Sequence, residues 1–147
     1  MHVVKLDEVM SLTRTITPAG LFGVGTDIIE IGRIKRAFER SGVRFLEKIF
    51  TPGEMGFCDV RKDRFSSYAA RFAAKEAVLK AIGTGMVGCS LLDVEVTRPG
   101  GGRPEIVLNG AAADIAKEKG IATVLISISH NRDQAVAFAI ATGKEVL

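Results

Sequence analysis

The sequence of 147 residues contains no tryptophan, one tyrosine, two cysteines and four prolines. Cys58 and Cys89 lie far apart and outside any Cys-x-x-Cys or Cys/His pattern, so we expect neither a disulfide framework nor a zinc site. The longest apolar stretches, such as 121–128, are much shorter than the roughly 18 to 20 residues of a membrane span. The charged N-terminus does not resemble a secretory signal, so we expect a cytoplasmic protein without a membrane partner.

What is present is typical of one globular domain: 47% hydrophobic residues, 25% charged residues and 16 glycines. Residues 1–20 show no clean periodicity and end in turn residues, so we interpret them as a peripheral extension, and 21–147 as a single domain. The net charge of +3 and the pI of about 9.0 suit an acidic partner, but so small an excess does not indicate one by itself.

Hydrophobic periodicity and turn residues predict an α+β arrangement in the order strand, helices, hairpin, helix and two strands. The predicted strands are 21–28, 92–97, 105–108, 121–128 and 135–141. The predicted helices are 30–40, one that begins with a capping box at 51–54, a long one over 64–82, and one that runs from 109–110 to Gly120. The glycines of the first strand indicate a close approach of another backbone.

Asp27 stands at the end of the first predicted strand among apolar neighbours, where an unpaired carboxylate would be costly. Two roles are open for it. It could cap the following helix, where a negative charge is favourable, or it could bind a metal ion, and the two roles are compatible.

The long predicted helix carries few charges in its second half: Arg71, Lys75, Glu76 and Lys80. On a helical wheel, Glu76 and Lys80 lie at the edge of the apolar face beside Ala69 and Ala73, whose small side chains leave room for a ligand. The alternative is a routine ion pair between Glu76 and Lys80 at i, i+4.

Two further segments could bind a ligand. Gly83-Thr84-Gly85 is explained by a glycine that ends the helix, or by backbone amides that donate to a phosphate. His130 ends a strand, and the alternation of side chains places Ser127 and Ser129 on one face and His130 on the other or at the turn. Spacing therefore supports no Ser/His nucleophile pair and no hydrolase triad.

Four segments together resemble one known family: Gly23-Val-Gly-Thr-Asp-Ile-Ile-Glu-Ile31, Phe50-Thr-Pro-Gly-Glu54, Arg71-Phe-Ala-Ala-Lys-Glu-Ala-Val-Leu-Lys-Ala81 with Gly83-Thr-Gly85, and Ser127-Ile-Ser-His130. The sequence is similar over residues 21–141 to the holo-[acyl-carrier-protein] synthases, which are small phosphopantetheinyl transferases. The resemblance implies their α+β fold, in which an antiparallel sheet packs against a long central helix.

The resemblance also implies an activity. Enzymes of this family transfer the 4'-phosphopantetheine group of coenzyme A to a serine of apo acyl carrier protein and release adenosine 3',5'-bisphosphate, in a magnesium-dependent step of fatty acid biosynthesis. By this likeness the catalytic residues are Asp27, Glu76 and Lys80, and Asp27 and Glu76 hold Mg²⁺, which prefers one or two carboxylates together with substrate phosphates. The coenzyme-binding residues implied are Arg71, Lys80, Gly83, Thr84, Gly85 and His130.

In the expected reaction, Lys80 neutralises the charge that develops on the pyrophosphate. The base for the serine hydroxyl is left open between a metal-bound water, Asp27 and, as a weaker candidate, His130. Arg33, Arg36 and Arg40 lie on one helical stripe, and the resemblance makes them the docking face for the acidic helix of the carrier protein. The alternative is an ordinary solvated arginine face.

The family resemblance further implies a homotrimer with coenzyme A bound across each subunit boundary, so that Glu76 and His130 reach one ligand from different chains. The apolar residues around almost the whole long helix point the same way, because a small domain has limited interior to cover them. The rival hypothesis is a non-catalytic basic module that binds nucleotide or RNA, although the scattered aromatic residues do not match an RNA-recognition sheet. A second rival is an interaction protein with a decayed site.

Overall fold

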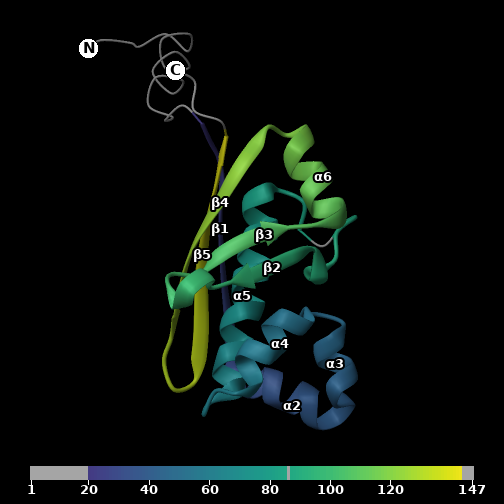
Figure 1. Ribbon diagram of the computed structural model, residues 1–147, viewed down its shortest axis with the longest axis vertical. Coiled ribbons are helices and arrows are strands. Elements are labelled where there is room, and N and C mark those ends of the chain that lie inside the picture. The colour runs from purple at the N-terminus through teal and green to yellow at the C-terminus, as the bar shows by residue number, and fades with distance from the viewer. Residues whose placement is uncertain (1–19, 86, 144–147) are drawn as a thin grey trace, which may run out of the picture.

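The order of helices and strands agrees with the α+β prediction (Figure 1). The computed structural model describes residues 20–85 and 87–143. Its elements are β1 (Leu21–Glu30), α2 (Ile31–Ser41), α3 (Val43–Glu47), α4 (Pro52–Asp59), α5 (Arg64–Ile82), the 3-10 turn η1 (Leu91–Asp93), β2 (Val94–Thr97), the 3-10 turn η2 (Pro99–Gly101), β3 (Glu105–Leu108), α6 (Gly110–Glu118), β4 (Ile121–His130) and β5 (Gln134–Gly143). The short helix α3 was not predicted, and β1, β4 and β5 run farther than predicted. Of the predicted extension, residues 1–19 lie outside the described residues.

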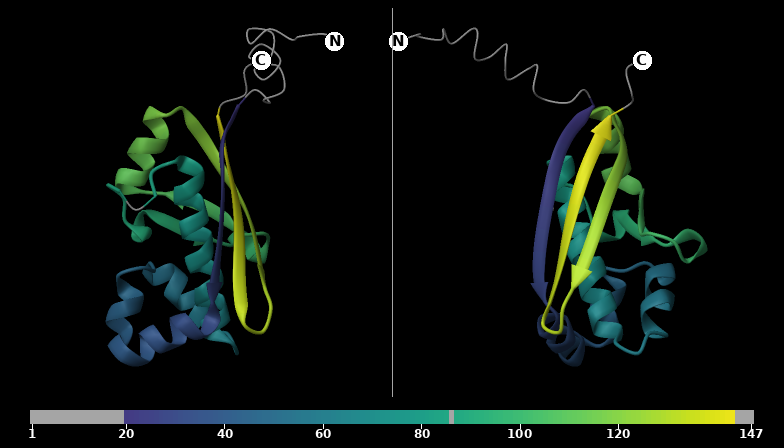
Figure 2. Two further views of the ribbon diagram at one scale, coloured as in Figure 1. Left: turned by 180° about the vertical axis from the view of Figure 1, so that it is seen from behind. Right: turned by 90° about the vertical axis from the view of Figure 1, so that its left-hand side faces the viewer.

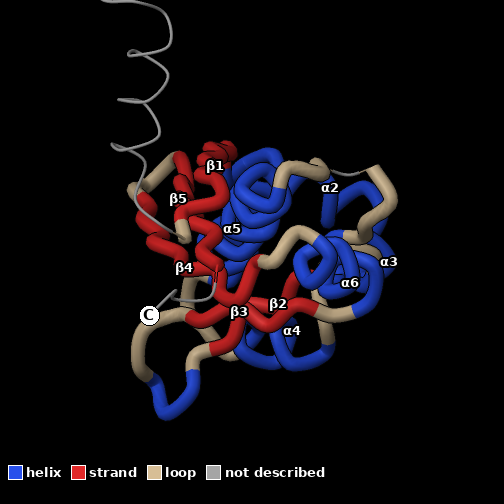
Figure 3. Tube along the Cα trace, turned by 90° about the horizontal axis from the view of Figure 1, so that it is seen from above, coloured by secondary structure: helices blue, strands red, loops and turns tan. Residues whose placement is uncertain are grey.

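An antiparallel sheet with the order β1-β5-β4 packs one face against α5, and β2 and β3 form a separate two-stranded sheet. Seen from above, the helices lie on one side of the three strands (Figure 3). Register places Asp27 opposite Ala137, and Ala137 opposite Ile128. This confirms the predicted pairing of the last two strands and the long central helix.

Small residues bring the sheet and α5 unusually near each other. Four alanines of β5 face α5 and are buried, namely Ala135, Ala137, Ala139 and Ala141. A Cβ atom added to Gly25 would lie 2.0 Å from the carbonyl oxygen of Ala77, and one added to Gly23 would lie 2.3 Å from that of Ala81. No side chain fits at either position, so the predicted close approach of backbones is confirmed.

The helix α5 begins and ends as its sequence predicts. The Asp63 carboxylate accepts the amide of Ser66 at the N-terminus, and Gly83 adopts φ 89° at the C-terminus, where an L side chain would be strained. Among the described residues, no helix combines the length and the apolarity that a membrane span requires.

A buried ion pair joins α5 to α4 and to the β2–β3 sheet. The Lys75 ammonium lies 2.5 Å from Glu54 and also donates to the carbonyls of Ile49 (2.7 Å) and Leu91 (3.1 Å), while Glu54 accepts the amide of Val96 (3.0 Å). Neither charged side chain is exposed. The Thr51–Glu54 capping box is confirmed, and the same carboxylate thereby serves both α4 and Lys75.

The opposite face of the three-stranded sheet is apolar and is covered by no described element (Figure 2). Its exposed apolar side chains are Val24, Ile28, Leu125, Phe138 and Ile140. By contrast, α5 is largely buried inside the chain by the sheet, α2, α4 and α6. The argument that α5 needs another subunit to cover it is therefore wrong, because the apolar surface left open belongs to the sheet.

Candidate active site

Asp27 and Lys80 meet where β1 lies along α5. The Lys80 ammonium donates to the Asp27 carboxylate at 3.2 Å and to the carbonyl of Thr26 at 2.9 Å. Asp27 does not cap the next helix, because β1 continues to Glu30 and that residue, without a side-chain cap, precedes the start of α2 at Ile31. The capping hypothesis is wrong, and Asp27 remains available to a ligand.

Glu76 completes a group of two carboxylates and two cations. Its burial and the nearby Asp27 carboxylate raise the pKa of Glu76, while Lys80 and Arg33 lower it. Among the ion pairs of the described residues, Lys80 is paired with Asp27 and none includes Glu76, so the alternative of an i, i+4 pair between Glu76 and Lys80 is wrong. The Glu76 carboxylate therefore has an acidic neighbour in Asp27 and no direct ion pair among the described residues, and a bound cation would stabilise both carboxylates.

The donor set fits magnesium better than a transition metal. Within residues 20–85 and 87–143 there is no cluster of three or more His, Cys, Asp or Glu that could hold a metal ion. Mg²⁺ is bound in such sites by one or two carboxylates, with substrate phosphates and water completing the octahedron. Asp27 and Glu76 carry oxygens of this kind, and their binding of Mg²⁺ stays a prediction.

The alanines of α5 leave no room for a ligand. Ala69 and Ala73 are fully buried, because the chain itself packs against them. The prediction of space beside these residues is wrong. The prediction that Glu76 and Lys80 edge the core is confirmed, since Glu76 is half-buried and Lys80 exposed.

The amides of Gly83, Thr84 and Gly85 are used to end α5. All three amides donate to the carbonyl of Leu79, at 3.0, 3.2 and 3.3 Å. The amide of Gly83 also donates to the carbonyl of Lys80. The helix-end interpretation thus accounts for the segment. A contact with coenzyme through Gly83, Thr84 and Gly85 stays a prediction, and it requires these amides to exchange partners or the Thr84 hydroxyl to bind instead.

A second basic group surrounds Phe57 on α4. The guanidinium carbons of Arg71, Arg61 and Arg98 lie 3.8, 4.0 and 5.9 Å from the centre of its ring. Arg71 is only 5% exposed, and its Nε atom is buried without a hydrogen-bond partner. None of the three guanidinium groups takes part in an ion pair among the described residues, so the positive charge of this group is not neutralised by a paired carboxylate there.

His130 lies beside this group. It lines a hollow of about 490 Å³ together with Phe57, Arg61 and Lys62. Sequence reasoning found Arg71 and His130 but missed Arg61, Lys62 and Phe57. The adjacent charges Arg61-Lys62 before the long helix were the available signal.

Asp27 and His130 lie on opposite edge strands of the three-stranded sheet. β1 and β4 are separated by β5, two strand spacings or about 10 Å, and His130 lies two residues, about 7 Å, beyond the position level with Asp27. Register places Ser127 and Ser129 level with Phe138 and Val136, on the face away from α5, and His130 level with buried Ala135. The predicted division of Ser127 and Ser129 from His130 is confirmed.

The three arginines of α2 are exposed, as a docking surface requires. Arg36 makes an exposed ion pair with Glu30 at 3.8 Å, which contributes little in water. The charge of Arg33 also lowers the pKa of Glu76, so Arg33 lies near enough to act on that carboxylate. Whether Arg33, Arg36 and Arg40 bind a carrier protein stays a prediction.

Comparison with known proteins defines the class. A sequence model of the 4'-phosphopantetheinyl transferase superfamily matches residues 23–139, and this chain belongs to that superfamily. The chain is 52% identical over 123 residues to the holo-[acyl-carrier-protein] synthase of Desulforudis audaxviator (strain MP104C), a match that covers 84% of this chain and 94% of the relative.

Solved structures agree. The crystal structure of holo-[acyl-carrier-protein] synthase from Neisseria meningitidis superimposes with a TM-score of 0.76 at 35% identity, and covers 82% of this chain and 98% of that one. The enzyme from Helicobacter pylori in complex with coenzyme A gives a TM-score of 0.71 at 31% identity, and covers 80% and 98%. The resemblance found in the sequence is confirmed, and so is the fold that it implied.

Proposed function

We propose that this protein is a holo-[acyl-carrier-protein] synthase, which transfers 4'-phosphopantetheine from coenzyme A to a serine of apo acyl carrier protein. The observation that carries the proposal is the Asp27–Glu76–Lys80 group, which lies half-exposed between β1 and α5 in a chain of this superfamily. Such a group suits phosphoryl transfer, which depends mainly on positioning and on charge stabilisation.

Asp27 and Glu76 would hold Mg²⁺ in this proposal, and the bound ion would supply charge neutralisation to the pyrophosphate. Two adjacent carboxylates, with the pKa of Glu76 raised in part by Asp27, support the assignment. Lys80, half-exposed and hydrogen-bonded only to Thr26 and Asp27, can turn toward the phosphate oxygens without leaving a buried group unpaired.

The reaction exchanges one phosphorus–oxygen bond for another. The serine oxygen of the carrier protein bonds to the phosphorus that bears the pantetheine, and the bond from that phosphorus to the leaving adenosine 3',5'-bisphosphate breaks. The serine proton passes to a base. Asp27 lies in the charged group, whereas His130 lies at the other edge of the same chain, so geometry within one chain favours Asp27 over His130.

The phosphates at the adenosine end bind the basic group around Phe57. Arg71 offers a buried Nε without a partner, and Arg61, Lys62 and His130 surround the adjoining hollow. A charge-assisted hydrogen bond to phosphate would satisfy that atom. The complex of the Helicobacter pylori relative with coenzyme A supports the choice of ligand.

Arg33, Arg36 and Arg40 bind the acidic helix of the carrier protein. They project from α2, whose first residue follows directly on β1, so a carrier protein docked there has its serine near Asp27. Complementary charge of this kind speeds encounter and fixes orientation more than it adds affinity.

The active protein is a cytoplasmic homotrimer that serves fatty acid biosynthesis. The exposed apolar sheet face of Val24, Ile28, Leu125, Phe138 and Ile140 supports association, because large apolar patches on soluble proteins mark interaction sites. The register supports a shared site, since Asp27, which acts on the Glu76 carboxylate, and His130 lie on opposite edge strands of the sheet. One coenzyme molecule would then touch Glu76 of one chain and His130 of the next.

The activity is tested by incubating purified protein with an apo acyl carrier protein, coenzyme A and Mg²⁺ and weighing the carrier by mass spectrometry. We expect the carrier to gain one phosphopantetheine, with none gained when its acceptor serine is replaced by alanine. A basic nucleotide- or RNA-binding module would give no gain with any carrier tested and would bind RNA instead. That result would refute the proposal.

The shared site is tested by subunit exchange. The variants Glu76→Gln and His130→Ala should each be nearly inactive, and mixing them through an exchange step should restore part of the activity. Some boundaries would then pair an intact Glu76 with an intact His130. A monomeric mass in solution would dispose of the trimer, whereas a trimer without rescue would place both residues in a site of one chain.

A further inference from the structure

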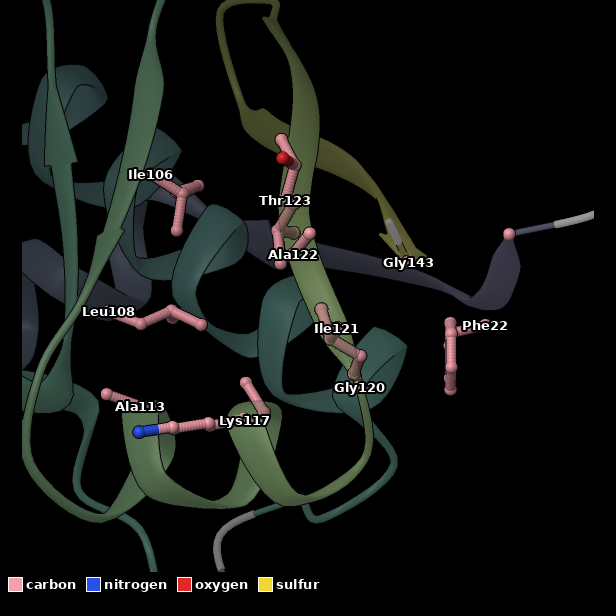
Figure 4. Close-up of a pocket in the computed structure, with 13 residues that line it drawn as sticks. Phe22, Ile106, Leu108, Ala113, Lys117, Gly120, Ile121, Ala122, Thr123 and Gly143 are labelled. Carbon is pink, nitrogen blue, oxygen red and sulfur yellow. The ribbon is translucent and has the colours of Figure 1, made fainter. Parts of the chain in front are cut away.

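Two hollows of the described chain differ in the charge of their linings. A cavity of about 980 Å³ lies between α6, β3 and β4, and Lys117 is the one charged residue among those that line it (Figure 4). The hollow of about 490 Å³ beside α4 has four titratable residues in its lining, namely Arg61, Lys62, Asp63 and His130. Asp63, its one acidic residue, accepts the amide and the hydroxyl of Ser66 and belongs to no ion pair of the described chain. The smaller hollow is therefore the basic one.

The ring of Phe57, which also lines this hollow, is shared by three arginines. The guanidinium carbons of Arg71 and Arg61 lie 3.8 and 4.0 Å from the centre of the ring, and that of Arg98 lies 5.9 Å from it. The arginines come from α5, from the turn between α4 and α5, and from the loop after β2. The ring is therefore common to cations from three separate parts of the chain.

The three positive charges repel one another, and the ring opposes that repulsion. Burial lowers the pKa of Arg71, and the charges of Arg61 and Arg98 lower it further, whereas Cys58 and Glu54 act in the opposite direction. The face of an aromatic ring carries negative charge density and attracts a cation placed over it. The ring thereby stabilises an arrangement that the arginines alone would not keep.

An aromatic ring can hold arginines without neutralising them. A carboxylate at the same place would form ion pairs with the guanidinium groups and occupy their N–H donors. A guanidinium group held over a ring keeps most of its five N–H donors for other partners. The buried Nε of Arg71 accordingly has no hydrogen-bond partner.

Arg64 shows the other arrangement in the same protein. Its guanidinium carbon lies 4.6 Å from the centre of the Phe38 ring and 5.0 Å from that of Phe65, and its Nη1 lies 3.6 Å from the Asp59 carboxylate. Arg64 thus has both aromatic neighbours and a counter-charge. The arginines around Phe57 have the ring but no ion pair among the described residues.

We propose that Phe57 is a positioning residue for phosphate binding: its ring holds the three surrounding arginines together, with their charge intact, for the phosphates of an adenosine bisphosphate. The inference rests on the function proposed above, which supplies this ligand. Phe57 acts through the arginines and takes no part in the transfer step.

Calorimetric titration of the full chain with adenosine 3',5'-bisphosphate tests the proposal. Phe57→Leu keeps an apolar side chain but removes the ring, and should weaken binding about tenfold. Phe57→Tyr keeps the ring and should bind as the unmodified protein does. Phe65→Leu is the matched control, because it removes a ring beside Arg64, whose ion pair with Asp59 remains, and its binding should be unchanged. Equal binding by Phe57→Leu and the unmodified protein would overturn the proposal.

A charged substitution separates the holding of charge from simple packing. Phe57→Glu supplies a carboxylate that pairs with the same arginines, so it should bind the bisphosphate more weakly than Phe57→Leu does. Tighter binding by Phe57→Glu than by Phe57→Leu would overturn the requirement for a group that is held but not neutralised.

Kinetics distinguish a failure of this inference from a failure of the proposed function. Phe57→Leu should raise the KM for coenzyme A about tenfold and leave kcat and the KM for the carrier protein nearly unchanged. A lower kcat with an unchanged KM for coenzyme A would overturn the positioning role while transfer by the unmodified protein upheld the function. An unmodified protein that transferred nothing and bound no bisphosphate would refute the proposed function, and this inference with it.

Discussion

Lys75 and Glu76 are neighbours in the sequence, yet α5 carries their charges into two opposite environments. Lys75 is fully buried against Glu54 and has three hydrogen-bond acceptors. Glu76 is half-buried, raised in pKa by burial and by Asp27, and absent from the ion pairs of the described chain. One helix thus holds a completed charge network on one side and an incomplete one on the other.

The difference shows how to separate structural from functional charges in this protein. A buried charge whose partners are all present stabilises the fold only as long as both partners remain. A charged side chain near the surface without an ion-pair partner is stabilised when a ligand of the opposite charge binds. By the same reasoning, the buried Nε of Arg71, which has no hydrogen-bond partner, supports the proposal that Arg71 binds the coenzyme.

The largest expected effect is on the completed network. Lys75→Met would leave Glu54 buried and unpaired, and should lower the free energy of unfolding by about 3 to 5 kcal/mol. Urea denaturation followed by circular dichroism measures it. Lys80→Met is the matched control, because its side chain is half-exposed and its loss should cost less than about 1 kcal/mol. Equal losses for the two lysines would break the comparison.

On the other side of α5 the order of effects should reverse. Glu76→Gln and Asp27→Asn should each reduce magnesium-dependent transfer by about 100-fold or more, because each removes a charge that the transferring group requires. Stability should change by less than about 1 kcal/mol, since each substitution also relieves repulsion between the two carboxylates. Steady-state kinetics and denaturation of the same samples provide the check. Near-normal turnover in either variant would remove the metal assignment.

A smaller effect is expected at the docking face. Reversing Arg33 and Arg36 to Glu should raise the KM for the carrier protein by about tenfold and leave that for coenzyme A nearly unchanged. Arg33 also lowers the pKa of Glu76, so the single variant Arg33→Glu should additionally lower kcat, whereas Arg40→Glu should not. An equal rise in both KM values would contradict a separate docking face.

The smallest effect concerns a thiol behind the completed network. Burial raises the pKa of Cys58 to about 12, so below that pH the thiol stays protonated and unreactive. Half-exposed Cys89 should be alkylated at pH 8 within minutes and Cys58 only when α4 separates from α5. Lys75→Met should speed the labelling of Cys58 alone, which peptide mass spectrometry resolves. Rapid labelling of Cys58 in the unmodified protein would contradict this account of burial.

Local patterns were enough to predict most elements. Pro52 and Glu54 predicted the start of α4. The alanines predicted a long helix at α5, and Gly83 predicted its end. Turn residues predicted where one strand ends and the next begins. The helix α3 was missed because it has only five residues, too few to show a period. The ends of β1, β4 and β5 were drawn short because their last residues are held by cross-strand hydrogen bonds, which the local sequence does not report.

The site divides in the same way. Asp27, Glu76 and Lys80 could be chosen from a motif, but the pairing of Lys80 with Asp27 instead of Glu76 depends on how β1 lies on α5. The gathering of Arg61, Arg71 and Arg98 around Phe57 unites α4, α5 and a loop that are distant in sequence. The prediction of room for a ligand beside Ala69 and Ala73 was wrong, because a small side chain is compatible both with free space and with a closely packed neighbour. The sequence alone does not distinguish the two.

The contact of Gly23 and Gly25 with the main chain of α5 bears on how this enzyme can evolve. Where two backbones touch, no exchange of side chains can widen or narrow the gap, so the spacing of Asp27 from Glu76 is inherited with the fold itself. Mutation can redraw the surface of α2 or the rim around Phe57 in single steps while the reacting centre keeps its dimensions. If the proposed docking face is correct, point substitutions on α2 would change which carrier protein docks without changing the backbone spacing that separates Asp27 from Glu76.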